Sequence, residues 1–297
     1  MTRLRRRVLP AGLAAALLAL GAAPRVTADT ATERIYVTVI DSDGKPVAGL
    51  TAADFGVQLD GTLQEIVSAA PANEPLSVVI MTDRLGLNST YTALDVRQTL
   101  VEFVGAIRAN NPDSRIGLTT FDGTAIQVTK FSSARTDLDR ALTRLATTAA
   151  DAVMLDALGD VCKMMVRDAP TDRRAILTLL AAYRPDQSNL RHEVVTELLR
   201  LSGASLWTVE VRQADRGNFS NNVREVVLDS GGLMSGGTRE IVGSRTGVTA
   251  STKHMAELML AQYAITYAPG GGSGHSQLRV GLRRPGLRAL APRWISR

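Results

Sequence analysis

The chain has 297 residues, with 34 Lys+Arg against 29 Asp+Glu and a formal net charge of +5. Five of the arginines lie in residues 1–28, which hold no acidic residue, so 29 basic side chains face 29 acidic ones over residues 29–297. A nucleic-acid-binding protein needs a sizeable positive excess to displace counterions, so we expect no nucleic-acid partner. The single cysteine, Cys162, cannot form an intramolecular disulfide, and we predict it to be a buried helix residue.

The first residues have the pattern of a secretory signal peptide. Four arginines within residues 3–7 precede an apolar stretch over residues 8–23, and small residues at 26–28 offer a cleavage point before Asp29. A membrane anchor is the alternative, but Pro10 and Gly12 interrupt the run, which is shorter than the roughly 20 residues that span a bilayer. We predict a signal peptide over residues 1–28 and a secreted or periplasmic chain, with membrane contact only through an uncleaved signal segment.

Residues 29–73 have the pattern of short β-strands. Alternation predicts a strand over residues 35–40, followed by a turn over 41–46. Residues 55–59 give a second strand, closed by Asp60-Gly61, and residues 64–67 give a third. Residues 69–75 have the composition of a linker.

From residue 74 to residue 262 the pattern changes to alternating strands and helices. Residues 76–81 form a short apolar run, as expected for a strand that is buried on both faces. Such alternation predicts an α/β fold with a doubly wound, mostly parallel sheet and helices on both faces. The further strands are expected over 115–121, 125–131, 175–180, 206–211 and 239–242, the helices over 91–109, 138–145, 154–166, 190–201, 223–228 and 254–261, and a flexible glycine-rich loop over 231–237.

Residues 263–297 return to a strand pattern, with strands expected over 263–267, 277–282 and 287–294. We expect this C-terminal segment to pack with the strands of residues 29–73 as a small flanking β subdomain.

Several motifs give the chain a family resemblance. Residues 74–262 resemble the von Willebrand factor A (VWA) domain, and the whole chain is similar to bacterial secreted VWFA-related proteins of the acidobacterial type. This resemblance implies a Rossmann-like α/β fold and an adhesion-type binding function. The motifs that carry it are Val37–Leu50 with Asp54-Phe55 and Asp60-Gly61, Pro75–Asp83, Met154–Leu158, Arg173–Leu177, Tyr263–Pro269 and Arg284–Leu287.

The resemblance also implies a divalent metal site at the C-terminal ends of the strands, and here the sequence departs from the family. The family's first loop has the pattern Asp-x-Ser-x-Ser, whereas this chain has Asp83-Arg84-Leu85-Gly86-Leu87. Ala152 stands where the second loop supplies a threonine, and Ala181-Ala182 stand where the third supplies an aspartate. Magnesium requires near-octahedral oxygen coordination, so we predict no metal cofactor.

Some oxygen-bearing side chains remain near these loops, which leaves binding of magnesium or manganese as an alternative. They are Ser89, Thr90, Asp151 and Asp186.

The leading functional hypothesis is metal-independent binding of another protein or extracellular macromolecule at this rim. Leu85 and Leu87 replace hydroxyl residues in a loop expected at the surface, and apolar residues beside an arginine suit an interface. Alternatively, both leucines close over the vacant metal site. The candidate rim residues are Asp83, Arg84, Leu85, Leu87, Ala152, Ala181 and Asp186, with the loop Tyr183–Pro185 beside them.

Two rival hypotheses come from other classes of function. One is a metal-dependent VWA adhesion domain with a rearranged site. The other is an exported hydrolase that uses Ser235, although Leu233 stands where a nucleophile elbow needs glycine. His192, His254 and His275 have no ligand or catalytic spacing, and no phosphate-binding glycine motif occurs. We therefore expect a protein that is not an enzyme.

Overall fold

The protein is described here from a computed structural model, which covers residues 32–83, 93–121, 123–132, 135–143, 153–181, 186–211, 222–243, 245–270 and 274–296. The predicted signal peptide lies outside these residues. Residues 31–297 belong to one unit by their contacts. In the part of the chain that the structure describes, no helix has the length and apolar character needed to cross a membrane.

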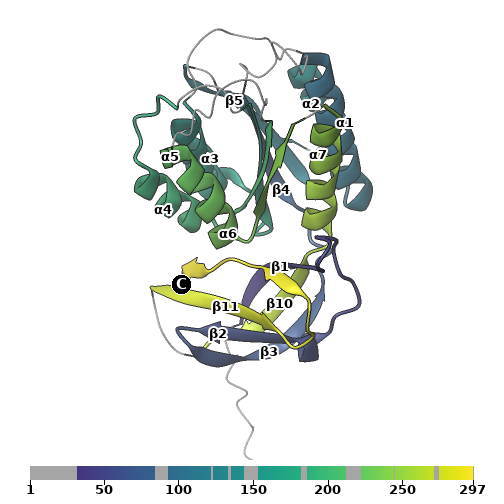
Figure 1. The fold of residues 1–297 in the computed structure, drawn as a ribbon, viewed down its shortest axis with the longest axis vertical. Coiled ribbons are helices and arrows are strands. Elements are labelled where there is room, and N and C mark those ends of the chain that lie inside the picture. Colours follow the sequence, from purple (N-terminus) through teal and green to yellow (C-terminus); the bar gives the residue numbers. More distant parts are fainter. Residues whose placement is uncertain are drawn as a thin grey trace, which may run out of the picture. The chain divides into compact units, whose positions relative to one another are not determined.

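A six-stranded sheet forms the centre of the α/β region (Figure 1). Its order is β6-β5-β4-β7-β8-β9, and every pairing is parallel except that of β5 with the edge strand β6. This arrangement confirms the predicted fold class. The strands are β4 (Ser77–Asp83), β5 (Arg115–Phe121), β6 (Ala125–Ser132), β7 (Arg174–Ala181), β8 (Ser205–Val211) and β9 (Thr238–Val242).

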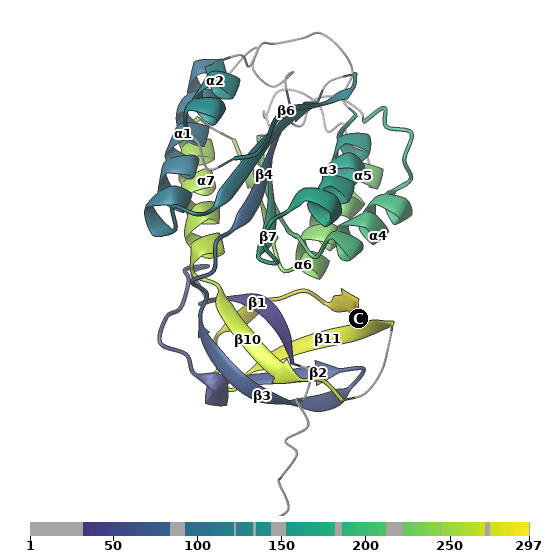
Figure 2. The ribbon, with the colours of Figure 1, turned by 180° about the vertical axis from the view of Figure 1, so that it is seen from behind.

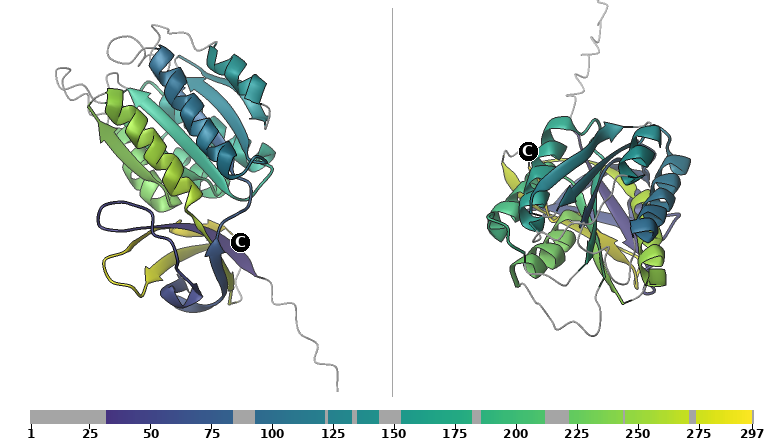
Figure 3. Two further views of the ribbon diagram at one scale, coloured as in Figure 1. Left: turned by 90° about the vertical axis from the view of Figure 1, so that its right-hand side faces the viewer. Right: turned by 90° about the horizontal axis from the view of Figure 1, so that it is seen from above.

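Helices cover both faces of this sheet (Figure 3). Alternate residues of a strand point to opposite faces, so Val78 and Ile80 join one apolar core, while Val79 and Met81 join the other. On the first face lie α1 (Ala93–Asn110), α2 (Arg135–Thr143) and α7 (Arg245–Leu260); on the second lie α3 (Met154–Asp168), α4 (His192–Ser202) and the run α5 (Asn222–Val226), η3 (Val227–Gly231) and α6 (Gly232–Ser235).

The two ends of the described chain pair in a second, antiparallel sheet (Figure 2). Its order is β12-β1-β10-β3-β2-β11-β13, so strands from the N-terminal and C-terminal segments are intermixed. Ile35, Val57 and Ile265 lie in its apolar core. The strands are β1 (Glu33–Ile40), β2 (Phe55–Leu59), β3 (Thr62–Pro71), β10 (Tyr263–Ala268), β11 (His275–Leu282), β12 (Arg288–Leu290) and β13 (Trp294–Ser296), with a 3-10 turn, η1, at Ala52–Asp54.

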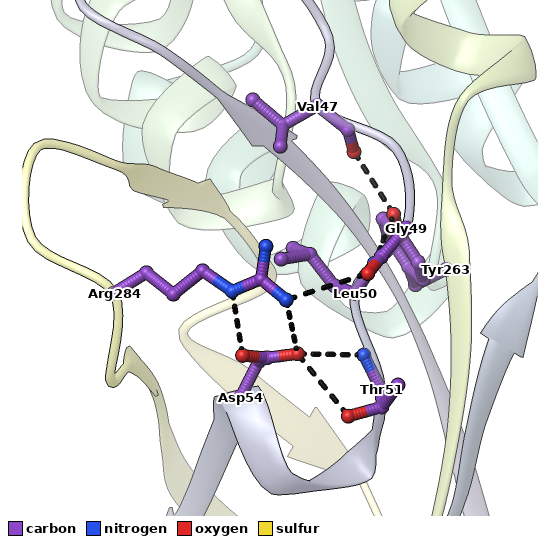
Figure 4. Close-up of polar contacts among 7 residues, drawn as sticks. All are labelled: Val47, Gly49, Leu50, Thr51, Asp54, Tyr263 and Arg284. Carbon is purple, nitrogen blue, oxygen red and sulfur yellow. Dashed lines mark hydrogen bonds and ion pairs between the residues drawn. The ribbon is translucent and has the colours of Figure 1, made fainter.

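A polar cluster fixes the connection between β1 and β2 (Figure 4). The Arg284 guanidinium donates to both carboxylate oxygens of Asp54, at 2.7 and 3.1 Å, and the Thr51 amide donates to the same carboxylate at 2.8 Å. The Tyr263 hydroxyl donates to the Val47 carbonyl at 2.9 Å and accepts from the Leu50 amide at 3.1 Å. Two side chains of the C-terminal segment therefore hold this loop by hydrogen bonds.

Three expectations about element boundaries are wrong. β3 continues to Pro71 because residues 69–71 pair with β10, so this part of the expected linker is strand. α7 begins at Arg245, not at 254, because Val248, Met255 and Met259 form a buried stripe that Gly247 and several hydroxyl residues obscure in the sequence. The expected strand over 287–294 is two short strands, β12 and β13, interrupted at 291–293.

The glycine-rich stretch 231–237 is not a flexible loop. It contains the end of η3 and all of α6, and Gly236 closes the helix in the left-handed region at φ 86°. A Cβ atom on Gly237 would lie 1.9 Å from the Leu206 carbonyl oxygen. Glycine is therefore needed because the backbone passes directly against β8.

Candidate functional site

The candidate rim is formed by the C-terminal ends of the central strands. After β4 the chain forms β5 on one side of β4 and later forms β7 on the other side. The boundary between β4 and β7 is therefore the switch point, the place where open α/β sheets bind ligands. Asp83 is the last residue of β4 and only 6% exposed. Ala181 ends β7, and the pairing of Thr82 with Leu179 places the two strand ends side by side.

Most of the predicted rim residues lie outside the described residues, so their roles stay predictions. For Ala181 the structure gives the backbone position only. The residues concerned are Arg84, Leu85, Leu87 and Ala152, together with Tyr183–Pro185 and the possible donors Ser89, Thr90 and Asp151.

Asp186 acts as a cap for helix α3. Val153, at the N-cap position of α3, provides no side-chain cap. The Leu155 amide instead donates to Asp186 Oδ2 at 3.2 Å, while the Ser188 amide donates to Oδ1 at 2.9 Å. Because the first amides of a helix have no partner within the helix, a carboxylate from the third loop takes the place of the missing cap.

The contact between α3 and the segment before α4 is reciprocal. The Asp156 amide donates to the Ser188 hydroxyl at 3.0 Å, and the Asp156 carboxylate accepts from the amides of Asn189 and Leu190. We call Asp156, Asp186 and Ser188 the α3 clasp. It joins the first turn of α3 to the segment before α4 through hydrogen bonds that use carboxylate oxygens.

The absence of a metal cofactor stays a prediction, because most rim residues lie outside the described residues. Among the described residues, no group of three or more His, Cys, Asp or Glu side chains is placed to hold a metal. Asp83 and Asp186 are the rim carboxylates, and each oxygen of Asp186 accepts a backbone amide. A hard cation that requires six oxygen ligands would have to compete with the cap of α3.

A buried charged network joins β8 and β9 to the helices that precede β9. Glu210 has no exposed surface and forms ion pairs with Arg239 and Arg224. Arg239 also contacts Glu225 and Asp229, each at 2.7 Å. Burial lowers the pKa of Arg239, but its hydrogen bonds to Glu210 and Asp229 outweigh that effect and hold the pKa above its usual value. The network therefore fixes α5 and η3 to the sheet.

This network was not predicted, although the sequence carries a signal for it. A glutamate inside the apolar strand 206–211 must have a partner when it is buried. The sequence gives no indication that the partners are Arg224 and Arg239, because they come from separate elements.

The Ser235 hydroxyl has a structural role. It accepts from the Leu206 amide at 2.9 Å and donates to the Gly232 carbonyl at 3.1 Å. The histidines contact other groups: His254 contacts Glu240 and Gly44, His192 contacts Glu193, and His275 contacts Arg200. These contacts give the hydrolase hypothesis no support.

Comparison with protein-family models and with curated proteins found no match. Solved structures do match in fold. BatB from Bacteroides thetaiotaomicron is 11% identical, with a TM-score of 0.43 and coverage of 61% of this chain and 99% of that chain. The VWA domain of SpRpn10 is 10% identical, with a TM-score of 0.47 and coverage of 61% and 94%.

A third match is the vWF domain of the type V pili tip protein Mfa5 from Porphyromonas gingivalis. It is 11% identical, with a TM-score of 0.45 and coverage of 62% of this chain and 94% of that chain. This domain and that of SpRpn10 carry the name of the family that the sequence motifs resemble. We base the functional proposal on this chain's own residues.

Proposed function

We propose that this chain is an exported, non-enzymatic VWA-type module that binds another protein at the strand-end rim without a metal ion. The observation that carries the proposal is the engagement of Asp186. Its two oxygens accept the amides of Leu155 and Ser188, which leaves Asp83 as the described rim carboxylate outside the α3 clasp.

The chemistry of the rim favours a protein partner. Arg84, Leu85 and Leu87 follow Asp83 directly in the sequence. Protein interfaces are enriched in arginine and apolar residues and depleted in carboxylates at their centre. A rim that has exchanged hydroxyls for leucines therefore suits contact with a protein better than coordination of a cation.

Metal independence is tested by thermal unfolding with magnesium, with manganese and with a chelator. A ligand that binds the folded state at 100 times its Kd stabilises by about 2.7 kcal/mol, so a bound metal would raise the Tm measurably. We expect equal Tm values in all three conditions. A metal-dependent rise that disappears in Asp83→Ala would instead support the rival, a metal-dependent adhesion domain.

Protein binding is tested by crosslinking capture from the envelope fraction of the source cells. We expect the same captured proteins with chelator and with magnesium, and their loss in the double variant Leu85→Glu, Leu87→Glu. Leu63→Glu is the matched control, since Leu63 is 65% exposed on β3 in the other sheet. Capture that is identical for the rim variant and the control would contradict binding at the rim.

A further inference from the structure

A cavity of about 560 Å³ lies at the N-terminal ends of β7 and β8, at the opposite end of the sheet from the rim. Strand β1, the end of α4, α6 and the C-terminal segment form its walls. Its apolar lining includes Leu199, Leu201, Met234, Trp294 and Ile295. This volume is in the range of sites that hold ligands.

One wall of the cavity is an unpaired strand edge. β1 pairs with β10 over Glu33–Val37, but on its other side it pairs with β12 only over Thr38–Ile40. The residues of β1 that line the cavity, 33–36, are in the part that β12 does not reach. Among the described residues this part of β1 has no strand neighbour on the β12 side.

The backbone groups of Arg34 and Tyr36 face this open side. The Val39 carbonyl accepts the Val47 amide at 2.8 Å, on the side away from β12. The backbone groups of successive strand residues point to alternate sides. Since those of Val39 point away from β12, those of Arg34 and Tyr36 point to the side on which β12 pairs. At an open strand edge such groups are available to pair with another strand.

The gap is created by specific contacts of the C-terminal segment, which ends close to α6 (Figure 2). After β12 the chain turns away from β1. Pro292, which has no N–H group, forms a bridge with Ser235, and the Arg293 amide donates to the Met234 carbonyl at 2.8 Å. β13 then pairs with β11 instead of β1. Contacts with α6 and β11 therefore hold the C-terminal segment away from residues 33–37 of β1, and this leaves the strand edge open.

The cavity also offers a positive group. Arg174 is 19% exposed, and its Nε and Nη1 donate to the carbonyls of Thr171 and Ser202. Its Nη2 forms a long ion pair with the Asp172 carboxylate at 3.6 Å, and because the Asp172 side chain is 95% exposed, a carboxylate in the cavity can replace it on Arg174. The other charged lining residues have partners: Glu33 with Tyr267, Arg34 with Glu74 and Arg200 with Glu197.

We propose that this cavity binds an extended peptide segment of another protein, which adds a strand to the open edge of β1 and places a carboxylate on Arg174. Strand addition supplies partners for the backbone groups of Arg34 and Tyr36, and the apolar lining contacts the alternate side chains of the peptide. The edge of five residues is about 16 Å long at the usual strand rise, which matches a short segment. This site is separate from the rim and does not depend on the function proposed there.

The test is fluorescence anisotropy with the full chain and a labelled octapeptide of alternating valine and threonine with a free C-terminal carboxylate. We expect binding that weakens roughly tenfold or more when alternate peptide amides are N-methylated. An amidated peptide in which one internal threonine is replaced by aspartate distinguishes a side-chain carboxylate from a terminal one. Hydrogen exchange at residues 33–37 should slow when the peptide is added.

Leu201→Glu is the blocking variant, because Leu201 lines the cavity and is 45% exposed, so its substitution leaves the core intact. Val194→Glu is the matched control on the same helix, with the same 45% exposure but outside the cavity lining. Binding lost in Leu201→Glu and retained in Val194→Glu supports the proposal. No binding at about 1 mM peptide, indifference to N-methylation, or a dimer of the chain that Leu201→Glu dissociates would each overturn it.

Discussion

The guanidinium of Arg173 donates to the carbonyl of Met259 at 2.6 Å, which joins the start of β7 to the last turn of α7. The same guanidinium donates to the carbonyls of Ala72 and Glu74, in the segment between β3 and β4, and to the side chain of Gln262. Arg173 is 1% exposed, and burial lowers its pKa. One buried cation therefore satisfies backbone groups from both connections between the two sheets.

We expect Arg173→Met to lower the free energy of unfolding by about 3–5 kcal/mol, because several buried oxygens lose their donor at once. Urea unfolding followed by circular dichroism measures the loss. Arg167→Met is the control: the Arg167 side chain is 69% exposed and paired with Asp168, so its loss should leave the stability almost unchanged. Equal effects of the two substitutions would contradict the role of Arg173.

The sequence predicts most of the fold because the pattern is local. The central strands β4, β7 and β8 are short, mostly apolar runs, and the sequence alternates such runs with amphipathic helices. The start of α7 and the helical turns of η3 and α6 were not predicted correctly from the sequence. There the deciding contacts are between distant residues, such as Gly237 with Leu206 and Pro292 with Ser235.

The candidate site is less predictable for the same reason. The sequence predicts a rim that lacks most of the family's oxygen ligands, but it does not indicate that Asp186 caps α3. Nor does it indicate the open edge of β1, because that edge depends on where β12 ends and β13 begins. Tertiary contacts decide which groups a side-chain oxygen binds and which strand edges remain open.

Gly237→Ala tests the packing of the glycine-rich stretch. The added methyl group would meet the Leu206 backbone, which cannot move without disturbing β8. We expect a loss of about 3 kcal/mol or more, as for overpacking against a rigid backbone. Gly49→Ala is an unsuitable control because of its positive φ; Gly105→Ala, in α1 with no atom near the added carbon, should be neutral or slightly stabilising. A flexible loop would tolerate both substitutions.

Asp54 should make the stability of the chain depend on pH. The hydrogen bond from Arg284 holds the pKa of Asp54 below its usual value, with further help from the Thr51 amide. A carboxyl whose pKa is lower in the folded state stabilises that state above the unfolded pKa and loses this effect as the pH falls through the folded value.

Asp54→Asn should therefore be less stable than the natural chain at neutral pH, and the difference should shrink below about pH 4. Urea midpoints across this pH range provide the measurement. Arg284→Gln should show the same trend, since it removes the partner. A difference that stays constant with pH would show that the loss has a cause other than the charge of Asp54.

Substitutions of Asp186 distinguish a metal-independent rim from a rim that binds a metal ion. If its carboxylate caps α3, Asp186→Ala should lower the free energy of unfolding by about 1–2 kcal/mol, as the loss of a helix cap does. Asp186→Asn keeps one oxygen acceptor and should lose less. Both variants should unfold identically with magnesium and with a chelator, because no metal is released. If Asp186 is instead a ligand, the natural chain will be stabilised by magnesium and Asp186→Ala will not be. The comparison therefore decides whether the third loop of this rim holds a helix or an ion.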